Sequence, residues 1–297
     1  MAMQAAFDSS LQTTVFFSIK FHTMHLTTLG LWVTSVVSTG INSNSNSNGA
    51  LRIMPVGDSI TQWHCGSQAR NPADPKSTAS FGGFRGPLFQ QLQAKWGENA
   101  FATVGGEYGC GSHEGHSGWT CEDLAGIITT SAVSYSPDVV LLMCGTNDLY
   151  YRPSTLKPEK GGNVTQVLDR MTMLLASLFA VRPNATVLLS TVPEINATKC
   201  LSYGAGPCPP SMPTNIAAVN AALPTAVVAP LVAAGRRVFL RDVNDDARWE
   251  EADFWTWGIH RSEEGFAKMA ASFLQNILAH VVPPTHSPAA AKVAARS

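Results

Sequence analysis

The sequence has little net charge and no cluster of one sign. Its 297 residues carry a formal net charge of -1, and only 14% of them are charged. There is no run of lysine or arginine, which is the usual signal of a nucleic-acid groove or of a protein that binds anionic membranes. We therefore expect a neutral substrate and no nucleic-acid partner.

The chain is also poor in metal-binding patterns. None of its six cysteines stands in a Cys-x-x-Cys pair with histidines nearby. This absence argues against the common structural zinc sites. We expect no metal and no cofactor.

Features of a targeting segment precede the globular part. Lys20 lies ahead of an apolar stretch at 26–37, and small residues follow at 38–40, which is the pattern of a secretory signal peptide. The apolar stretch is short and rich in threonine and serine, which disfavours a membrane-spanning helix. We expect a targeting segment at 1–40, with Met24 as an alternative start, and no stable membrane insertion after its removal.

The remaining length fits one domain and two short flanks. Hydrophobic residues make up 45% of the chain, and a domain of about 230 residues is of ordinary size. We expect a flexible Asn/Ser-rich linker at 41–50, the domain at 51–282 and a flexible tail at 283–297. We expect the protein to be a monomer.

Cysteines and glycosylation sequons support secretion. Cys200 and Cys208 bracket a Gly/Pro-rich loop, so we expect them to pair. Cys65 has either Cys110 or Cys121 as its expected partner. Sequons for N-glycosylation begin at Asn163, Asn184 and Asn196.

Apolar runs of strand length alternate with helix-like stretches. The runs lie at 51–56, 102–104, 139–144, 186–190 and 237–240, and the helix-like stretches at 84–96, 164–181, 216–234 and from Ser262 onward. Pro224 and Pro230 are expected to break the third helix, and Cys144 to be a free thiol in a buried strand. Alternating strands and helices predict a parallel sheet covered on both faces. The expected fold class is α/β, with three layers and a doubly wound five-stranded sheet in the order 2-1-3-4-5.

A serine follows the first of these strands directly. The segment 57–61 reads Gly-Asp-Ser-Ile-Thr and comes straight after the run that ends at Val56. There the Ser59 hydroxyl can project from the carboxyl edge of the sheet, and a helix starting behind it directs free N–H groups toward negative charge. Ser59 is a candidate nucleophile, although Gly, Asp and Ser alone are ordinary turn residues.

Three further clusters supply partners for Ser59. They are Gly-His-Ser-Gly-Trp-Thr at 115–120, Gly-Thr-Asn-Asp at 145–148 and Gly-Ile-His at 258–260. Acyl transfer from an ester needs a nucleophile, a base and donors that face the developing oxyanion. His260 fits the role of the base. The expected oxyanion donors are the main-chain N–H groups of Ser59 and Gly118 and the side-chain amide of Asn147.

These four blocks, in this order, resemble those of the SGNH (GDSL-type) hydrolase superfamily, which centre on a Ser, a Gly, an Asn and a His. The amino-acid sequence of the blocks at 53–61, 113–120 and 137–148 looks most like that of carbohydrate esterase family three, which contains acetyl xylan esterases. The resemblance spans residues 51 to 281. It implies the flavodoxin-like fold of that superfamily and a serine esterase that needs no cofactor.

One position departs from the family pattern. The pattern has an aspartate three residues before the catalytic histidine, where its carboxylate accepts the imidazole N–H and fixes the tautomer. In this chain the position is Trp257. Two alternatives stay open: Asp253 supplies the carboxylate, or the main-chain carbonyl of Trp257 accepts the N–H in a Ser-His dyad. A third is that activity has been lost.

Other polar residues in the blocks have ordinary explanations. His113 and His116 invite a metal or second-base interpretation, but we expect them to be hydrogen-bonded loop residues. Asp58 is expected to cap a helix and stabilise the turn, with a hydrogen bond toward the Asn147 loop. Asp148 is also expected to be structural.

The sequence thus predicts a secreted, extracellular serine esterase that removes acetyl groups from a plant-type polysaccharide such as xylan. Trp119, Tyr150 and Trp255 are candidate substrate-binding residues, since sugar rings stack on aromatic rings, although aromatic rings also fill cores. The chain has no long apolar lid segment, which favours a short acyl group. The alternatives are a lipid or aryl esterase of the same superfamily and a carbohydrate-binding pseudoenzyme.

Overall fold

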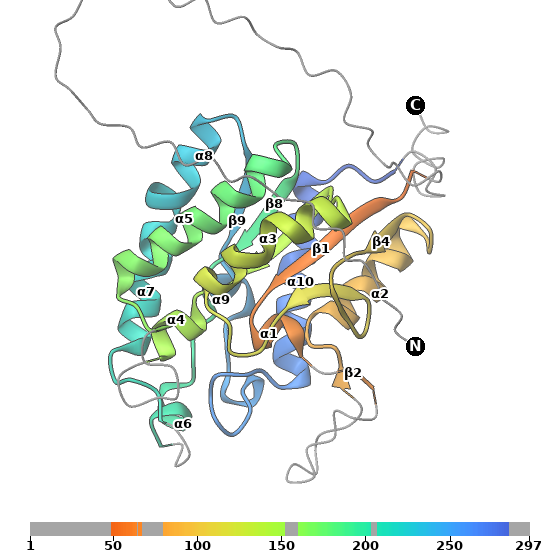
Figure 1. Ribbon diagram of the computed structural model, residues 1–297. Helices are drawn as coiled ribbons and strands as arrows, with labels where there is room; N and C mark the ends of the chain where they lie inside the picture. The colour runs from red at the N-terminus through yellow and green to blue at the C-terminus, as the bar shows by residue number, and fades with distance from the viewer. Residues whose placement is uncertain (1–48, 64, 67–79, 152–159, 203–206, 285–297) are drawn as a thin grey trace, which may run out of the picture. The chain divides into compact units, whose positions relative to one another are not determined.

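The computed structural model of the chain describes residues 49–63, 65–66, 80–151, 160–202 and 207–284. The expected targeting segment at 1–40 lies outside the described residues, as do nearly all of the linker and the tail. Within the described part, helices cover both faces of a sheet (Figure 1), as the alternation of strands and helices predicted.

The central sheet has the expected order of parallel strands. β1 (Leu51–Gly57) pairs with β7 (Val139–Met143), and β8 (Thr186–Ser190) and then β9 (Arg237–Arg241) follow on the same side. These four strands are apolar runs that end at the same edge. The carboxyl edge of the sheet therefore gathers the loops that follow each of them.

Strand β1 has two short parallel neighbours on its other side. β4 (Phe101–Thr103) pairs with the first residues of β1, and β6 (Ser112–Gly115) pairs with the last. β5 (Glu107–Tyr108) lies antiparallel to β6, so the sheet has seven strands rather than the expected five. The difference arises because the glycine-rich segment after β4 leaves β1 and returns as β6. A separate pair, β2 (Cys65–Gly66) and β3 (Ser80–Phe81), is antiparallel.

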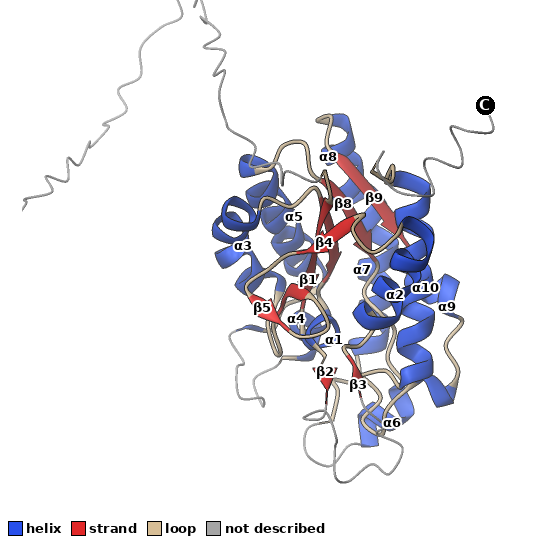
Figure 2. Cartoon of the chain, turned by 90° about the vertical axis from the view of Figure 1, so that its right-hand side faces the viewer, coloured by secondary structure: helices blue, strands red, loops and turns tan. Residues whose placement is uncertain are grey.

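The two layers of long helices stand on either side of the strands, as Figure 2 shows. On one face, α3 (Cys121–Tyr135) packs beside α5 (Val164–Val181), and α7 (Met212–Leu223) packs beside α5. On the other face, α2 (Arg85–Trp96) packs beside α10 (Glu263–His280). Side chains of the strands alternate between two buried clusters, one under each layer.

Shorter helices lie where strands end. They are α1 (Ser59–Gln62), α4 (Thr146–Tyr150), α6 (Ala197–Ser202), α9 (Val243–Ala247) and a 3-10 turn (Glu251–Asp253). These helices are too short to produce a periodic hydrophobic pattern, so of the five only the helix behind Ser59 is predicted from the sequence, on the basis of its turn and cap residues. Helices α1 and α4 begin directly behind β1 and β7, so both start at the carboxyl edge of the sheet.

Pro224 and Pro230 do not break the third long helical segment, contrary to the expectation. α7 passes into a π-helical turn (Pro224–Val228) and then into α8 (Ala229–Ala233). In the π turn the Ala229 N–H donates to the Pro224 carbonyl, and the wider turn accommodates a residue that has no N–H to donate. The segment Met212–Ala233 and α5 have the length and apolarity of membrane-spanning helices, a composition that core helices share.

All six cysteines form disulfides. The pairs Cys65–Cys110 and Cys200–Cys208 agree with the expectations from sequence. The prediction of Cys144 as a free thiol is wrong, because Cys144 bonds to Cys121, with their Cα atoms 5.7 Å apart. Cys121 is the first residue of α3, and the start of this helix lies against the end of β7.

Candidate active site

Ser59 lies at the turn from β1 into α1. Asp58 caps this helix, since its Oδ1 accepts the Ile60 N–H over 2.9 Å. Gly57 is required at the turn because a Cβ there would lie 2.3 Å from the main-chain oxygen of Met143. Ser59 is the first residue of α1 and is half-buried. Close packing and helix capping thus account for the Gly-Asp-Ser order.

The structure brings Ser59 and His260 into contact. The Oγ of Ser59 lies 2.8 Å from the Nε2 of His260, although 201 positions separate them in the sequence. His260 lies on the loop between the 3-10 turn and α10. A hydroxyl and an imidazole at this distance can exchange a proton.

Arg261 anchors the loop that carries His260. Its guanidinium lies between the rings of Trp249 and Phe254, at 4.2 and 4.3 Å from their centroids. It also donates a hydrogen bond to the main-chain carbonyl of Glu194. Burial lowers the pKa of Arg261 to about 9, so the group stays charged at neutral pH. The sequence did not reveal this role, because the recognisable motif ends at His260.

Two tryptophan rings lie next to the His260 ring. The ring centroids of Trp63 and Trp257 each lie 5.1 Å from the imidazole centroid, with interplanar angles of 39° and 51°. Trp255 packs edge-on against Trp63, with ring centroids 4.7 Å apart, and stacks on Trp257, with centroids 6.2 Å apart. The family pattern has an aspartate at sequence position 257. In this chain the residue there is Trp257, and its ring lies next to the imidazole.

Asp253 lies on the same loop, but its carboxylate bonds to other groups. Its Oδ2 accepts the Glu250 N–H over 2.7 Å and pairs with the Lys268 Nζ over 2.6 Å. The first contact closes the 3-10 turn, and the second ties that turn to α10. Asp253 is buried, so these two bonds offset the cost of desolvating its charge.

Gly118 lies in the loop between β6 and α3. Its φ of +75° falls in the left-handed region that favours glycine. A Cβ at this position would lie 2.9 Å from the Tyr151 hydroxyl, and that hydroxyl donates to the Gly118 carbonyl over 2.8 Å. The Ser117 N–H donates to the side chain of Gln62 over 2.8 Å. The loop is thus fixed to Tyr151, directly after α4, and to α1, the helix that begins with Ser59.

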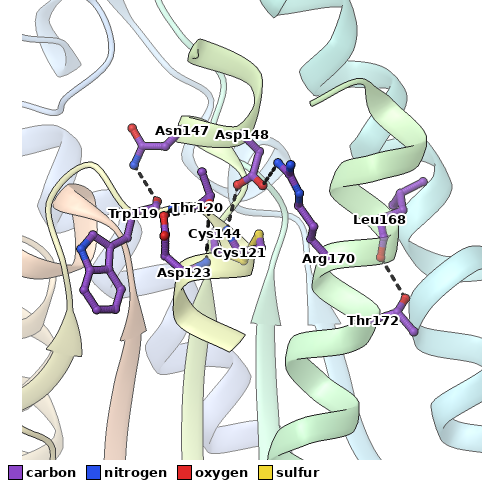
Figure 3. The surroundings of a disulfide bond; sticks show 10 residues. All are labelled: Trp119, Thr120, Cys121, Asp123, Cys144, Asn147, Asp148, Leu168, Arg170 and Thr172. Carbon is purple, nitrogen blue, oxygen red and sulfur yellow. Dashed lines mark hydrogen bonds and ion pairs between the residues drawn. A yellow bond between two sulfur atoms is a disulfide. The ribbon is translucent and has the colours of Figure 1, made fainter. Parts of the chain in front are cut away.

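Asn147 connects the loop after β7 to the loop after β6 (Figure 3). Its Nδ2 donates to the main-chain carbonyl of Trp119 over 2.8 Å. Beside it, Asp148 accepts the Cys121 N–H over 3.0 Å and pairs with Arg170 over 3.1 Å. The disulfide of Cys121 runs next to these bonds. Three of these contacts therefore hold the two loops together, and the pair with Arg170 ties Asp148 to α5.

The carboxyl group of Asp58 is buried next to Ser59. Burial raises the pKa of Asp58 to about 7, and the nearby Asp148 carboxylate adds to the rise. Burial raises the pKa of Asp148 as well, although the paired Arg170 opposes the rise. Asp58 is therefore largely protonated at mildly acidic pH, which avoids a full negative charge beside the serine.

His113 and His116 are hydrogen-bonded as expected, although His113 lies in β6 and not in a loop. The Nε2 of His116 lies 2.8 Å from the Oε2 of Glu114, and its ring stacks on Trp119 with centroids 4.0 Å apart. The Nδ1 of His113 accepts the Gly115 N–H over 3.0 Å, and burial lowers the pKa of His113 to about 3. Over the residues that the structure describes, no three His, Cys, Asp or Glu side chains come together as metal ligands.

Arg85 fixes the segment behind Ser59. It is fully buried and donates to the main-chain carbonyls of Thr61, Gln62 and Trp63 over 2.7, 2.6 and 3.1 Å. Burial lowers the pKa of Arg85 to about 10. No sequence pattern marks this residue, because its partners are main-chain groups that any residue would offer.

The three aromatic residues expected to bind substrate lie on the segments that carry the site. Trp119 follows Gly118 directly, Tyr150 ends α4, and Trp255 packs on the indoles beside His260. All three are half-buried. Each therefore combines packing inside the protein with some surface open to solvent.

Residues 56–268 match the GDSL-like Lipase/Acylhydrolase family, and this match covers well over half of the chain. A family 3 carbohydrate esterase from Clostridium thermocellum has a similar structure, with 25% identity and a TM-score of 0.56, over 77% of this chain and 96% of that one. A carbohydrate esterase family 3 protein from Talaromyces cellulolyticus shares 21% identity with a TM-score of 0.58, over 77% and 97% of the two chains. A variant of an acetylxylan esterase from Geobacillus stearothermophilus shares 19% identity with a TM-score of 0.55, over 77% and 95%. No curated protein sequence matches significantly.

The last two structures are too distant in sequence to show more than a common fold. The family match covers the segments of all four blocks, and the resemblance inferred from those blocks is thereby confirmed. The chain belongs to the GDSL-like lipase/acylhydrolase family and is a carboxylic ester hydrolase.

Proposed function

We propose that the chain is a secreted serine esterase that removes acetyl groups from a plant-type polysaccharide such as xylan. The observation that carries the proposal is the 2.8 Å contact between the Ser59 hydroxyl and the His260 imidazole at the carboxyl edge of the sheet. The loops of Gly118 and Asn147 are bonded to each other, and the Gly118 loop is bonded to α1, the helix that begins with Ser59, which supports their N–H groups as the oxyanion donors.

In the proposed cycle, the Ser59 Oγ attacks the acetyl carbonyl carbon while the Nε2 of His260 takes the hydroxyl proton. The negative charge on the carbonyl oxygen is stabilised by the N–H groups of Ser59 and Gly118 and by the Asn147 amide. The sugar oxygen then leaves with the proton from His260. A water molecule, deprotonated by the same imidazole, releases acetate and restores Ser59.

The group that orients His260 is the least conventional part of the proposal. The carboxylate of Asp253 already bonds to Glu250 and Lys268, which disfavours it as the partner of the outer imidazole nitrogen. We therefore favour the main-chain carbonyl of Trp257 as that acceptor. A carbonyl fixes the tautomer as a carboxylate does, but it brings no negative charge.

The substrate class is inferred from the surroundings of the site and from the similar structures. The Clostridium thermocellum protein, 25% identical, is a family 3 carbohydrate esterase. Trp119, Tyr150 and Trp255 offer partly exposed aromatic rings on which a sugar can stack.

Secretion is supported by features that lie outside the site. All six cysteines are in disulfides, which form and persist in oxidising compartments. Two of the three sequon asparagines, Asn163 and Asn184, are exposed and would be accessible to glycosylation. Asn196 is half-buried, and its Oδ1 accepts the Lys199 N–H.

Two assays test the proposed function. Hydrolysis of p-nitrophenyl esters of increasing chain length should fall steeply beyond acetate, and a maximum at longer acyl chains would instead support a lipid or aryl esterase. Release of acetate from acetylated xylan should disappear in Ser59→Ala. If the unmutated chain binds xylan and releases no acetate, the chain is a carbohydrate-binding pseudoenzyme.

A further inference from the structure

The acid-base step that is proposed for His260 forms a positive charge on the imidazole. In a triad, a neighbouring carboxylate stabilises this imidazolium. In this chain, the carboxylate of Asp253 bonds to the Glu250 N–H and to Lys268. At the sequence position where the family pattern has that carboxylate, this chain has Trp257, whose ring lies next to the imidazole.

Two indoles are in position to provide this stabilisation. The centroids of Trp63 and Trp257 are each 5.1 Å from the centroid of the His260 ring. A cation within about 6 Å of an aromatic centroid is attracted to the negative face of the ring, and tryptophan gives the strongest effect. We propose that the indoles of Trp63 and Trp257 stabilise the imidazolium form of His260 and thereby perform part of the role that a carboxylate has in the family pattern.

The two indoles are themselves held in place. Trp63 packs edge-on against Trp255, and its ring centroid lies 5.1 Å from that of Phe266 of α10. The main-chain carbonyl of Trp63 also accepts a hydrogen bond from buried Arg85. Trp257 stacks on Trp255. A fixed ring loses little freedom when the charge forms, so the stabilisation is available without reorganisation.

The inference rests on the proposed function only in taking His260 as the base. It is tested through the pKa of His260, which can be measured without any substrate. Stabilising the imidazolium raises the pKa of His260, so loss of an indole lowers it. Exclusion of water acts in the opposite direction, because burial disfavours the charged form. If the indoles served only to keep water away, their removal would raise the pKa of His260.

Other charges around His260 are the same in every variant compared. Among the described residues, the titratable and charged side chains nearest in sequence to the site on the surrounding elements are Asp58, Glu194, Lys199, Glu250, Glu251, Asp253, Arg261, Glu263, Glu264 and Lys268. Arg261 bonds to main-chain carbonyls. A difference between two variants therefore reports on the rings.

The experiment is an NMR titration of the full chain labelled at its histidines, with the His260 signal identified by its loss in His260→Gln. Trp257→Leu keeps apolar cover and the main-chain carbonyl but removes the ring, and Trp257→Phe keeps a weaker ring. We expect the pKa of His260 to fall by roughly half a unit to one unit in the Leu variant and by less in the Phe variant. Tyr108→Leu, at a side chain that is 89% exposed, should leave it unchanged.

The pair Trp63→Phe and Trp63→Leu repeats the comparison for the second indole. If Trp63→Leu fails to fold, the two Trp257 variants and Trp63→Phe still decide the matter. An unchanged or raised pKa of His260 in Trp257→Leu overturns the inference, as does a fall in the Phe variant as large as that in the Leu variant. In an active enzyme, the acidic limb of kcat/KM should move to lower pH by the same amount. Loss of esterase activity in the unmutated chain would overturn the proposed function but would not alter this titration.

Discussion

The side-chain amide of Asn147 donates a hydrogen bond of 2.8 Å to the main-chain carbonyl of Trp119. One N–H of the amide is thereby fixed to the loop that carries Gly118, and the amide has a second N–H. A donor held in this way needs no reorganisation when an oxyanion forms. The bond thus places two of the proposed oxyanion donors relative to each other.

We expect Asn147→Ala to reduce kcat on p-nitrophenyl acetate by about 10² to 10³, the usual loss for one oxyanion donor. Asn276→Ala is the control, because Asn276 is another asparagine whose Nδ2 donates to a main-chain carbonyl, that of Phe239; Asn276 is buried and Asn147 is half-buried. The control should lower stability but leave kcat unchanged. A kcat for Asn147→Ala within a few fold of the unmutated value would contradict the assignment.

Gly118 should not tolerate a side chain. In Gly118→Ala the residue would keep a φ of +75°, which is strained for alanine, and its Cβ would lie 2.9 Å from the Tyr151 hydroxyl, so that relief of the strain displaces the N–H or the Tyr151 bond that fixes it. We expect kcat to fall by about 10² or more. Gly126→Ala, on α3 where a Cβ meets no atom within 4 Å, should keep kcat and raise the free energy of unfolding by up to about 1 kcal/mol. Equal kcat values for the two variants would count against the role of Gly118.

The buried carboxyl of Asp58 should make stability depend on pH. Its pKa is about 7 in the folded protein, against an ordinary value of 3.8. Between these values the unfolded chain releases a proton that the folded protein keeps, so stability falls as pH rises through this window, by roughly 4 kcal/mol from this group. Asn can cap α1 as Asp does, so Asp58→Asn should gain stability relative to the unmutated protein as pH rises.

Chemical denaturation at a series of pH values from about 4 to about 8 measures this difference. Asp242→Asn is the control, since Asp242 caps α9 with an exposed carboxylate. Its stability should follow that of the unmutated protein across the whole range. Parallel curves for Asp58→Asn and the unmutated protein would show that Asp58 does not titrate in this window.

Asp253→Asn separates the two candidates for the group that orients His260. If the Trp257 carbonyl serves, turnover should fall by less than about tenfold, against the loss of about 10⁴ that follows neutralisation of a triad aspartate. Lys268→Gln breaks the same ion pair and corrects for its structural effect. A loss near the larger figure in Asp253→Asn alone would assign the role to Asp253.

The core of the fold and the four blocks could be predicted because their signals are local. Strands β1, β7, β8 and β9 are short apolar runs bounded by turn residues, and Ser59 lies directly behind the first of them. Parallel strands that alternate with helices leave few topologies. Contact between Ser59 and a histidine 201 positions away then follows from the rule that such loops meet at one edge.

The features that sequence could not predict depend on contacts between distant segments. Arg85 and Arg261 bond to main-chain carbonyls, which every residue offers, so no motif marks their partners. The bond of Cys144 to Cys121 depends on where α3 begins. The indole of Trp257 faces His260 because of the turn that Gly258, with a φ of +73°, makes between them.

The most direct test of the central claim is to map the adduct that a p-nitrophenyl phosphonate ester forms with the full-length protein. Such an ester reacts with an activated serine in the way that a carboxylic ester does. The account predicts stoichiometric labelling of Ser59, found by mass spectrometry of peptides, with no adduct in Ser59→Ala and much slower labelling in His260→Ala. An esterase-active protein that is labelled at another residue, or labelled at Ser59 equally fast without His260, would contradict it.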